Sequence, residues 1–212
     1  MTVAATGLNE KLLKRYNIPY RTVTVTRGNH SGYYPGATNI VLKMNFGEDG
    51  TIYGAQALGQ EGVDKRIDVI ATAIKGNLTI YDLQEIEIAY APPYNSAKDP
   101  VNILGYVAEN ILKDDVRFIN YDQLDDYLSN ENATLIDVRT QKEFENGAIP
   151  NAINMDVDTL RNNLDFFYKN KKYVIYCQIG LRGYLAQRIL RNHNIYCVNL
   201  NGGYGLWKPV NS

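Results

Sequence analysis

The spacing of apolar residues divides the chain into two parts. In the first part, apolar and polar residues alternate with a period of two, which is typical of strands with one buried face. This pattern predicts strands at residues 22–26, 40–46 and 51–58. Further on, apolar residues recur every three or four positions, and this pattern predicts helices at residues 62–75, 79–85 and 99–112.

The first fifteen residues are expected to be helical, with no strand before them. Leu8, Leu12 and Leu13 have the spacing of one helix face. Within the strand predicted at 51–58, Gly54 indicates a bulge or a close approach of another segment, because glycine has no side chain to pack.

Strands and helices alternate in the second part. The charged stretch 113–117 has no clear period, and we place the domain boundary there. The strands predicted after it are 134–138, 173–176 and 195–200, and the helices are 121–128, 141–146, 157–168 and 182–192. Apolar strands that alternate with helices predict a parallel sheet with helices on both faces. Ligands of such sheets bind beyond the carboxyl ends of the strands.

The composition is that of an ordinary globular protein. The 212 residues are 45% hydrophobic, and the net charge of −1 gives no reason to expect nucleic acid or an anionic membrane as a partner. No apolar run approaches the roughly 18–20 residues that span a bilayer, and the N-terminus lacks the apolar core of a secretory signal. Two cysteines without a C-x-x-C motif suit a reducing compartment, so we expect a cytoplasmic protein.

The segment Tyr173–Gly183, with the sequence Y-V-I-Y-C-Q-I-G-L-R-G, carries the clearest chemical signal. Cys177 follows a predicted strand and precedes a predicted helix, so backbone N–H groups and a helix N-terminus are expected to face its thiol. Such surroundings lower the pKa of a thiol and make it a nucleophile. Gly180 and Gly183 let backbone N–H groups turn toward the thiol, and Arg182 brings a positive charge to the mouth of the loop around Cys177. The alternative is a buried structural cysteine, the commoner role of a free cysteine.

The second cysteine and the two histidines are expected to have no catalytic role. Cys197 lies in a predicted strand and is interpreted as a core residue. It could act as a resolving cysteine, which forms a disulfide with Cys177, only if the two Cα atoms lie within about 7 Å. His30 and His193 have no ligand spacing to one another or to either cysteine, so surface or capping roles are expected and no metal site is predicted.

Four short pieces of the second part occur in a characteristic order. They are L-I-D-V-R at 135–139, E-F-E-N-G-A-I-P-N-A-I-N at 143–154, Y-C-Q-I-G-L-R-G at 176–183 and N-L-N-G-G-Y-G-L-W at 199–207. With them, residues 118–207 resemble the rhodanese-like sulfurtransferase family. The resemblance implies an α/β domain at 117–212, with Cys177 forming a persulfide and with Asp137 and Arg139 bracing its loop. The implied persulfide-binding loop consists of Gln178, Ile179, Gly180, Leu181, Arg182 and Gly183.

Two details of this loop bear on the substrate. Many rhodaneses have arginine where Gln178 stands, so one cationic contact is missing and persulfide or polysulfide donors are favoured over thiosulfate. Dual-specificity phosphatases resemble rhodaneses, but their cysteine loop is one residue longer to fit a larger anion. The segment from Cys177 to Arg182 has the shorter length, which favours sulfur over phosphate chemistry.

Three pieces of the first part also form a set. They are A-T-G-L-N-E-K-L-L at 5–13, N-H-S-G-Y-Y-P-G-A at 29–37 and Y-A-P-P-Y-N-S-A-K-D-P-V-N at 90–102. They resemble the dimerisation domain of pyridine nucleotide-disulfide oxidoreductases, in the branch of coenzyme A disulfide reductases and NADH-dependent persulfide reductases. The resemblance implies an α+β domain at 1–113 with an antiparallel sheet and helices, in which residues 1–15 are a remnant of the end of a flavin-binding domain.

The same resemblance implies a homodimer formed through residues 1–113. In that branch, tyrosines of the dimerisation domain reach the partner subunit's disulfide-reducing cysteine, and Tyr94 with Tyr33 or Tyr34 are the matching residues. A phenol hydroxyl can hydrogen-bond a thiolate or protonate a leaving thiol. The alternative role is packing at the dimer interface.

No G-x-G-x-x-G motif follows a predicted strand, so no dinucleotide site is expected. FAD, NAD(P)H and coenzyme A are implied only for a full-length relative, of which the chain is interpreted as the carboxyl-terminal portion. Two functions remain open. One is a sulfurtransferase that takes sulfur from coenzyme A persulfide, polysulfide or thiosulfate through Cys177, and the other is a non-catalytic dimerisation scaffold.

Overall fold

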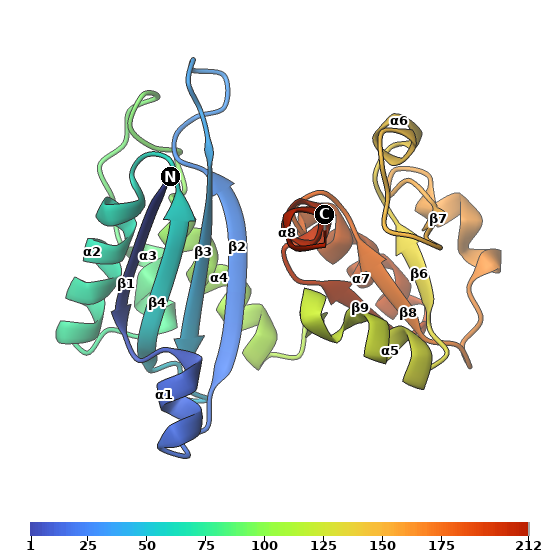
Figure 1. Cartoon of the computed structure of the whole chain (residues 1–212), viewed down its shortest axis with the longest axis horizontal. Coiled ribbons are helices and arrows are strands. Elements are labelled where there is room, and N and C mark those ends of the chain that lie inside the picture. Colours follow the sequence, from blue (N-terminus) through green and yellow to red (C-terminus); the bar gives the residue numbers. More distant parts are fainter. Residues whose placement is uncertain (212) are drawn as a thin grey trace. The chain divides into compact units, whose positions relative to one another are not determined.

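The computed structural model describes residues 1–211, which form two compact units that divide between Lys113 and Asp114 (Figure 1). Each unit has its own sheet, four-stranded and antiparallel in the first and five-stranded and parallel in the second. The predicted fold class, an α+β domain followed by an α/β domain, is therefore confirmed. No helix among the described residues is long and apolar enough to cross a membrane.

The first sheet has the strand order β1-β4-β3-β2. Its strands are β1 (Thr2–Gly7), β2 (Arg21–Gly28), β3 (Asn39–Phe46) and β4 (Ile52–Gly59). The apolar positions of the alternating pattern are the buried positions of this sheet. Val23 and Val25 on β2 and Leu42 and Met44 on β3 are all buried. They pack into one core with α2 (Val63–Lys75), α3 (Ile80–Glu85) and α4 (Pro100–Leu112) (Figure 1).

The start of the chain differs from its prediction. Strand β1 pairs with β4 along its whole length, and only Glu10–Arg15 is helical (α1). The apolar pattern missed β1 because an edge strand is held by backbone hydrogen bonds, and Val3 in it is 74% exposed. The close approach expected at Gly54 is present, since a Cβ on this residue would lie 2.4 Å from the Leu8 nitrogen.

Capping residues set the starts of two helices in the first unit. Thr79 and Asp82 form a capping box at the start of α3. At α4, the Asp99 carboxylate accepts a hydrogen bond from the Val101 N–H at 2.9 Å, and Pro100 takes the first helical position. Both starts agree with the sequence.

The second sheet has the strand order β5-β9-β8-β6-β7. Its strands are β5 (Phe118–Ile119), β6 (Thr134–Asp137), β7 (Ile153–Asn154), β8 (Tyr173–Tyr176) and β9 (Cys197–Leu200). Its helices are α5 (Leu124–Asn130), α6 (Gln141–Glu145), α7 (Leu181–Asn192) and α8 (Gly203–Val210), with the 3-10 segments η1 (Tyr121–Gln123) and η2 (Leu160–Phe166).

Four elements of this unit differ from the predicted helices and strands. Strands β5 and β7 have two residues each, too short for a periodic pattern, and α8 begins in a run of glycines that is typical of loops. The α-helix predicted at 157–168 is instead the 3-10 segment η2, which is interrupted at Asn163, where φ is −119°.

Alternate side chains of the parallel strands fill two separate cores. Ile136 and Ile175 belong to the core that includes residues of α7 and η2, whereas Leu135 and Val174 belong to the core that includes residues of α5 and α8. Helices therefore cover both faces of the sheet, as predicted.

Candidate active site at the cysteine loop

Cys177 directly follows β8, at the carboxyl edge of the parallel sheet. It is 1% exposed, and the backbone N–H of Gly180 donates a hydrogen bond to its Sγ at 3.1 Å. Gly180 is also the N-cap of α7 and has a φ of 110°, a conformation that glycine adopts without strain. The thiol therefore lies where an N–H group and the positive end of a helix dipole stabilise a thiolate.

The start of α8 holds the backbone of the cysteine loop. The Tyr204 N–H donates to the Cys177 carbonyl at 2.8 Å, and the Gly205 N–H donates to the Gln178 carbonyl at 2.9 Å. These two carbonyls are thereby turned toward α8, while the Gly180 N–H points at the thiol. The glycine-rich piece after β9 is thus part of the support of the loop.

Asn199 on β9 ties the loop to the sheet, a role that the sequence analysis missed. It is fully buried, and its Nδ2 donates to the Gly180 carbonyl at 3.0 Å. Its Oδ1 has no hydrogen-bond partner among the described residues, and a Cβ on Gly183 would lie 2.2 Å from it. Gly183 is therefore needed for close packing of α7 on Asn199. The N-L-N-G-G piece was the available signal, because an asparagine inside a buried strand needs a partner.

Asp137 and Arg139 lie against the loop as a buried ion pair, with 2.7 Å between Oδ2 and Nη2. Arg139 also donates from Nη1 to Gln178 Oε1 at 3.3 Å and from Nη2 to the Gly147 carbonyl at 2.7 Å. Its guanidinium carbon lies 4.2 Å from the centre of the Tyr204 ring. Burial disfavours the charged guanidinium, but the hydrogen bonds and charge of Asp137 outweigh it, and the pKa of Arg139 is raised.

Arg182, in the first turn of α7, forms a two-pronged ion pair with Glu143 of α6. Nη1 lies 2.6 Å from Oε2, and Nη2 lies 2.7 Å from Oε1. The hydrogen bonds from Arg182 lower the pKa of Glu143 to about 2. Glu143 first, and the Cys177 thiol to a lesser degree, raise the pKa of Arg182. The sequence alone predicts no role for Glu143 at the thiol, although it contains the T-x-x-E pattern of the capping box that Glu143 forms with Thr140.

The structure gathers the other predicted loop residues around Cys177. Gln178 and Ile179 are half-buried, Gly183 is buried, and Leu181 is 46% exposed. The rim of the site is thus partly apolar. No group of three or more His, Cys, Asp or Glu in residues 1–211 is arranged to hold a metal ion.

Cys197 lies at the opposite edge of the same sheet. It is the register partner of Tyr173, the first residue of β8, which precedes Cys177 by four residues. At about 3.3 Å per residue the two cysteines are roughly 13 Å apart along the strands, which is too far for a disulfide. Both thiols are free, and the possibility that Cys197 resolves Cys177 is wrong.

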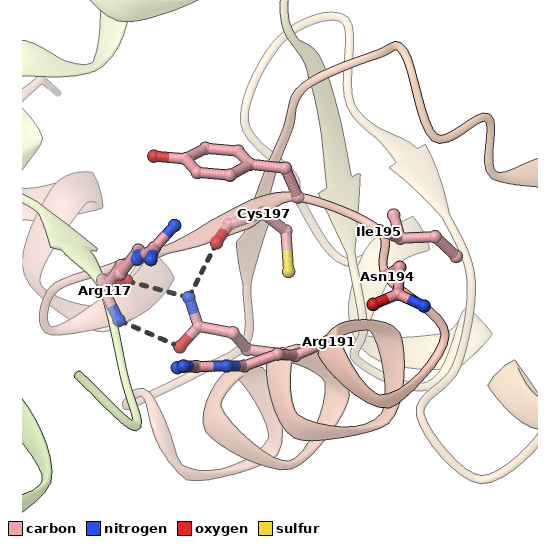
Figure 2. A pocket seen from close by; sticks show the side chains of 7 residues that line it. Arg117, Arg191, Asn194, Ile195 and Cys197 are labelled. Carbon is pink, nitrogen blue, oxygen red and sulfur yellow. Dashed lines mark hydrogen bonds between the residues drawn. The ribbon is translucent and has the colours of Figure 1, made fainter. Parts of the chain in front are cut away.

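The thiol of Cys197 borders a cavity of about 230 Å³ (Figure 2). Gln187 Nε2 donates to the carbonyls of Arg117 at 3.0 Å and Cys197 at 2.8 Å, as the dashed lines show. Burial raises the pKa of Cys197 to about 12, although the charges of Arg117 and Arg191 oppose this shift. A thiol with this pKa is neutral near pH 7, and Cys197 belongs to the hydrophobic core, as predicted.

In the first unit, the loop between β2 and β3 lies beside the loop that precedes α4. The N–H and the hydroxyl of Ser31 donate to the Asn95 carbonyl at 3.0 and 3.1 Å. Arg66 of α2 is buried and donates to the Asn29 carbonyl at 2.7 Å and to Asn95 Oδ1 at 3.1 Å. Its ion pair with Asp99, at 2.9 Å, completes a polar cluster that fastens both loops to α2 and α4.

These two loops carry the candidate tyrosines, all of which are exposed: Tyr33 by 77%, Tyr94 by 70% and Tyr34 by 42%. A hydrogen bond with Tyr90, which the sequence analysis did not single out, raises the pKa of Tyr33. The surface position expected for His30 is wrong. His30 is buried, and its ring packs edge-on against Tyr34 with centroids 5.8 Å apart.

Two family models match the chain. Residues 1–100 match the pyridine nucleotide-disulphide oxidoreductase dimerisation domain, and residues 120–209 match the rhodanese-like domain. The chain therefore contains a dimerisation domain of this oxidoreductase family followed by a rhodanese-like domain.

Two solved structures are similar over nearly the whole chain. Reduced CoADR-RHD from Bacillus anthracis is 49% identical with a TM-score of 0.94, and the match covers 98% of this chain and 37% of the other. A NAD-dependent persulfide reductase from A. fulgidus is 35% identical with a TM-score of 0.87, with coverage of 97% and 37%. Coenzyme A disulfide reductase from Staphylococcus epidermidis is 44% identical over 109 residues, 51% of this chain and 24% of the relative. The chain spans about a quarter to a little over a third of these relatives.

Proposed function

We propose that the chain is a sulfurtransferase that carries sulfane sulfur on Cys177. The observation that supports this most strongly is the hydrogen bond from the Gly180 N–H to Sγ at the start of α7. The same surroundings that favour a thiolate also favour the persulfide anion formed from it. The short segment from Cys177 to Arg182 supports sulfur rather than phosphate as the group transferred.

The proposed reaction has two halves. A persulfide donor R–S–SH presents its outer sulfur to the Cys177 thiolate, a bond forms between Sγ and that sulfur, and the donor S–S bond breaks. The proton of the outer sulfur passes to the departing sulfur, so the donor leaves as the thiol R–SH and Cys177 is left as a persulfide anion. An acceptor thiol R′–SH then takes the outer sulfur as R′–S–SH and regenerates the thiolate. Atoms and charge balance without an added oxidant or reductant.

Coenzyme A persulfide and polysulfide are the proposed donors, with thiosulfate a weaker one. The similarity to a coenzyme A disulfide reductase and a persulfide reductase supports this class of substrate. FAD and NAD(P)H are implied for a full-length relative, and in this chain the N–H groups of the glycine-rich turn after β9 already bind the carbonyls of the cysteine loop. We therefore assign these cofactors to a reductase that acts together with the chain, and no step of the reaction depends on them.

We further propose that residues 1–113 form a homodimer, and that Tyr94 with Tyr33 or Tyr34 would reach the disulfide-reducing cysteine that a full-length relative holds in its partner subunit. The exposure of the three phenols supports this role, and so does the polar cluster around Arg66 that fixes their loops. A cytoplasmic location suits a catalytic thiol that must stay reduced. Light scattering at micromolar concentration is expected to give the mass of a dimer, and a monomer would contradict this part of the proposal.

Transfer of sulfur from an organic persulfide to a thiol tests the main proposal. Cys177→Ala is expected to abolish transfer, because no other thiol lies at the carboxyl edge of the sheet in the described part of the chain. Cys197→Ala is the matched control and is expected to retain most of the activity. An active Cys177→Ala variant would contradict the role of Cys177, and an inactive wild-type protein would favour the alternative of a non-catalytic dimerisation scaffold.

A further inference from the structure

We infer that Glu143 is a specificity-determining residue that makes the site prefer donors with little charge next to the transferred sulfur over the thiosulfate dianion. It does so by neutralising Arg182 at the mouth of the site. This inference rests on the proposed sulfur transfer through Cys177 and adds to it the residue that selects the donor.

The ion pair between Arg182 and Glu143 is close and two-pronged. Two charge-assisted hydrogen bonds of 2.6 and 2.7 Å engage both Nη atoms of Arg182 with both carboxylate oxygens of Glu143. The side chains of Arg182 and Glu143 are 30% and 34% exposed, so the pair stands at the accessible rim. An anion that approaches Cys177 therefore meets a guanidinium whose charge is already matched.

The other polar groups of the loop do not replace that charge. Arg139 is the second guanidinium beside the loop, and it is buried with Asp137 as its partner. Gln178 is neutral, and its Oε1 is engaged by Arg139. Both arginines at the site are thus paired with carboxylates, and the two pairs together have no net charge.

Thiosulfate transfer places a larger negative charge at this mouth than transfer from R–S–SH does. The Cys177 thiolate bonds to the outer sulfur of thiosulfate, the S–S bond breaks, and the electron pair leaves with sulfite. Three negative charges, one on the thiolate and two on the donor, are present before and after the step. Removing the carboxylate charge of Glu143 should favour the dianion about fivefold or more, from the interaction of charges roughly 7 Å apart in a water-like dielectric.

Glu143→Gln removes this charge with little other change. Glutamine is also accepted in the capping box, so its side-chain oxygen can still receive the hydrogen bond of the Thr140 N–H at the start of α6. Glu145→Gln is the matched control, because it makes the same charge change on the same helix at a residue that bonds Gln141 instead of Arg182.

The test measures kcat/KM for thiosulfate and for an organic persulfide in the wild type and both variants. Glu143→Gln is expected to raise the ratio of thiosulfate to persulfide about fivefold or more, and the gain should shrink as ionic strength rises. Glu145→Gln should leave the ratio within about twofold. An unchanged ratio in Glu143→Gln with an active wild type would overturn the inference and leave the proposed function standing, whereas a wild type inactive with both donors would overturn both.

A second readout does not depend on sulfur transfer. Iodoacetate and iodoacetamide differ in charge but attack the same thiolate, so the ratio of their rates at Cys177 cancels changes in thiol pKa. Glu143→Gln is expected to raise the iodoacetate-to-iodoacetamide ratio, with Glu145→Gln unchanged. An equal ratio in all three proteins would show that Glu143 does not control the charge at the mouth.

Discussion

The two cysteines of the parallel sheet belong to one hydrophobic core but lie at opposite ends of the strands. Cys177 follows a strand, receives the Gly180 N–H and lies at the start of a helix. Cys197 begins a strand, and its thiol lies among core residues with its pKa raised to about 12 by burial. Both are almost fully buried, at 1% and 5% exposure, so burial alone does not distinguish them.

What distinguishes the two thiols is the direction of the backbone around them. At the carboxyl edge of a parallel sheet the chain turns into helices whose N–H groups face the last residue of the strand, whereas the amino edge offers no such donors. The supporting ion pairs differ in the same way. Asp137 and Arg139 are buried at the first edge, while Asp114 and Arg117 near the second edge are 55% and 43% exposed.

The largest expected difference is in alkylation by iodoacetamide. With a pKa of about 12, roughly one Cys197 thiol in ten thousand is ionised at pH 8, so its rate should keep rising with pH toward 12. Cys177 should react faster than Cys197 by several orders of magnitude near neutral pH. Peptide mass spectrometry after timed labelling at several pH values measures both rates. Similar rates at pH 8 would remove the distinction between the edges.

A smaller effect is expected on stability when each arginine is replaced. Arg139→Met leaves the buried Asp137 without its partner and should lower the free energy of unfolding by about 3–5 kcal/mol. Arg117→Met breaks an exposed pair and should cost at most about 1 kcal/mol. Trp207 is the only tryptophan and lies in the second unit, so its fluorescence during urea unfolding reports on this unit. Equal losses would contradict the assigned difference between the edges.

The smallest of these effects concerns Asn199. Asn199→Asp removes the donor to the Gly180 carbonyl and should loosen the N–H that faces Sγ, which lowers kcat/KM for sulfur transfer about tenfold. The rate at which iodoacetamide alkylates Cys177 should also fall. Asn201→Asp is the control, because its side chain bonds Asn120 rather than the loop. If both variants keep the wild-type rates of sulfur transfer and alkylation, Asn199 serves folding alone.

Much of the fold followed from periodicity, and the failures have a common cause. Strands such as β2 and β8 have one or two buried faces and were visible as apolar patterns. Strand β1 has exposed side chains and depends on backbone pairing with β4, which no local pattern reveals. The sequence at the start of α8 is typical of a loop because glycine has a low helix propensity. The segment instead supports the loop at Cys177 through backbone hydrogen bonds.

The candidate site was predictable where one segment contains it and not where it depends on contacts between segments. Cys177 and its loop form one short run of sequence, and so do Asp137 and Arg139. The contacts of Glu143 and Asn199 cross 39 and 19 residues of sequence to reach Arg182 and Gly180. Only the folded sheet, with β8 between β6 and β9, brings such partners together.

The central claim is that the carboxyl edge of the sheet makes Cys177 a carrier of sulfur. The most direct measurement is mass spectrometry of the protein after brief exposure to an organic persulfide and removal of the excess. We expect a gain of one sulfur atom on the peptide that contains Cys177, its loss on addition of an acceptor thiol, and no gain on the peptide that contains Cys197. Sulfur found on neither peptide, or equally on both, would contradict the account.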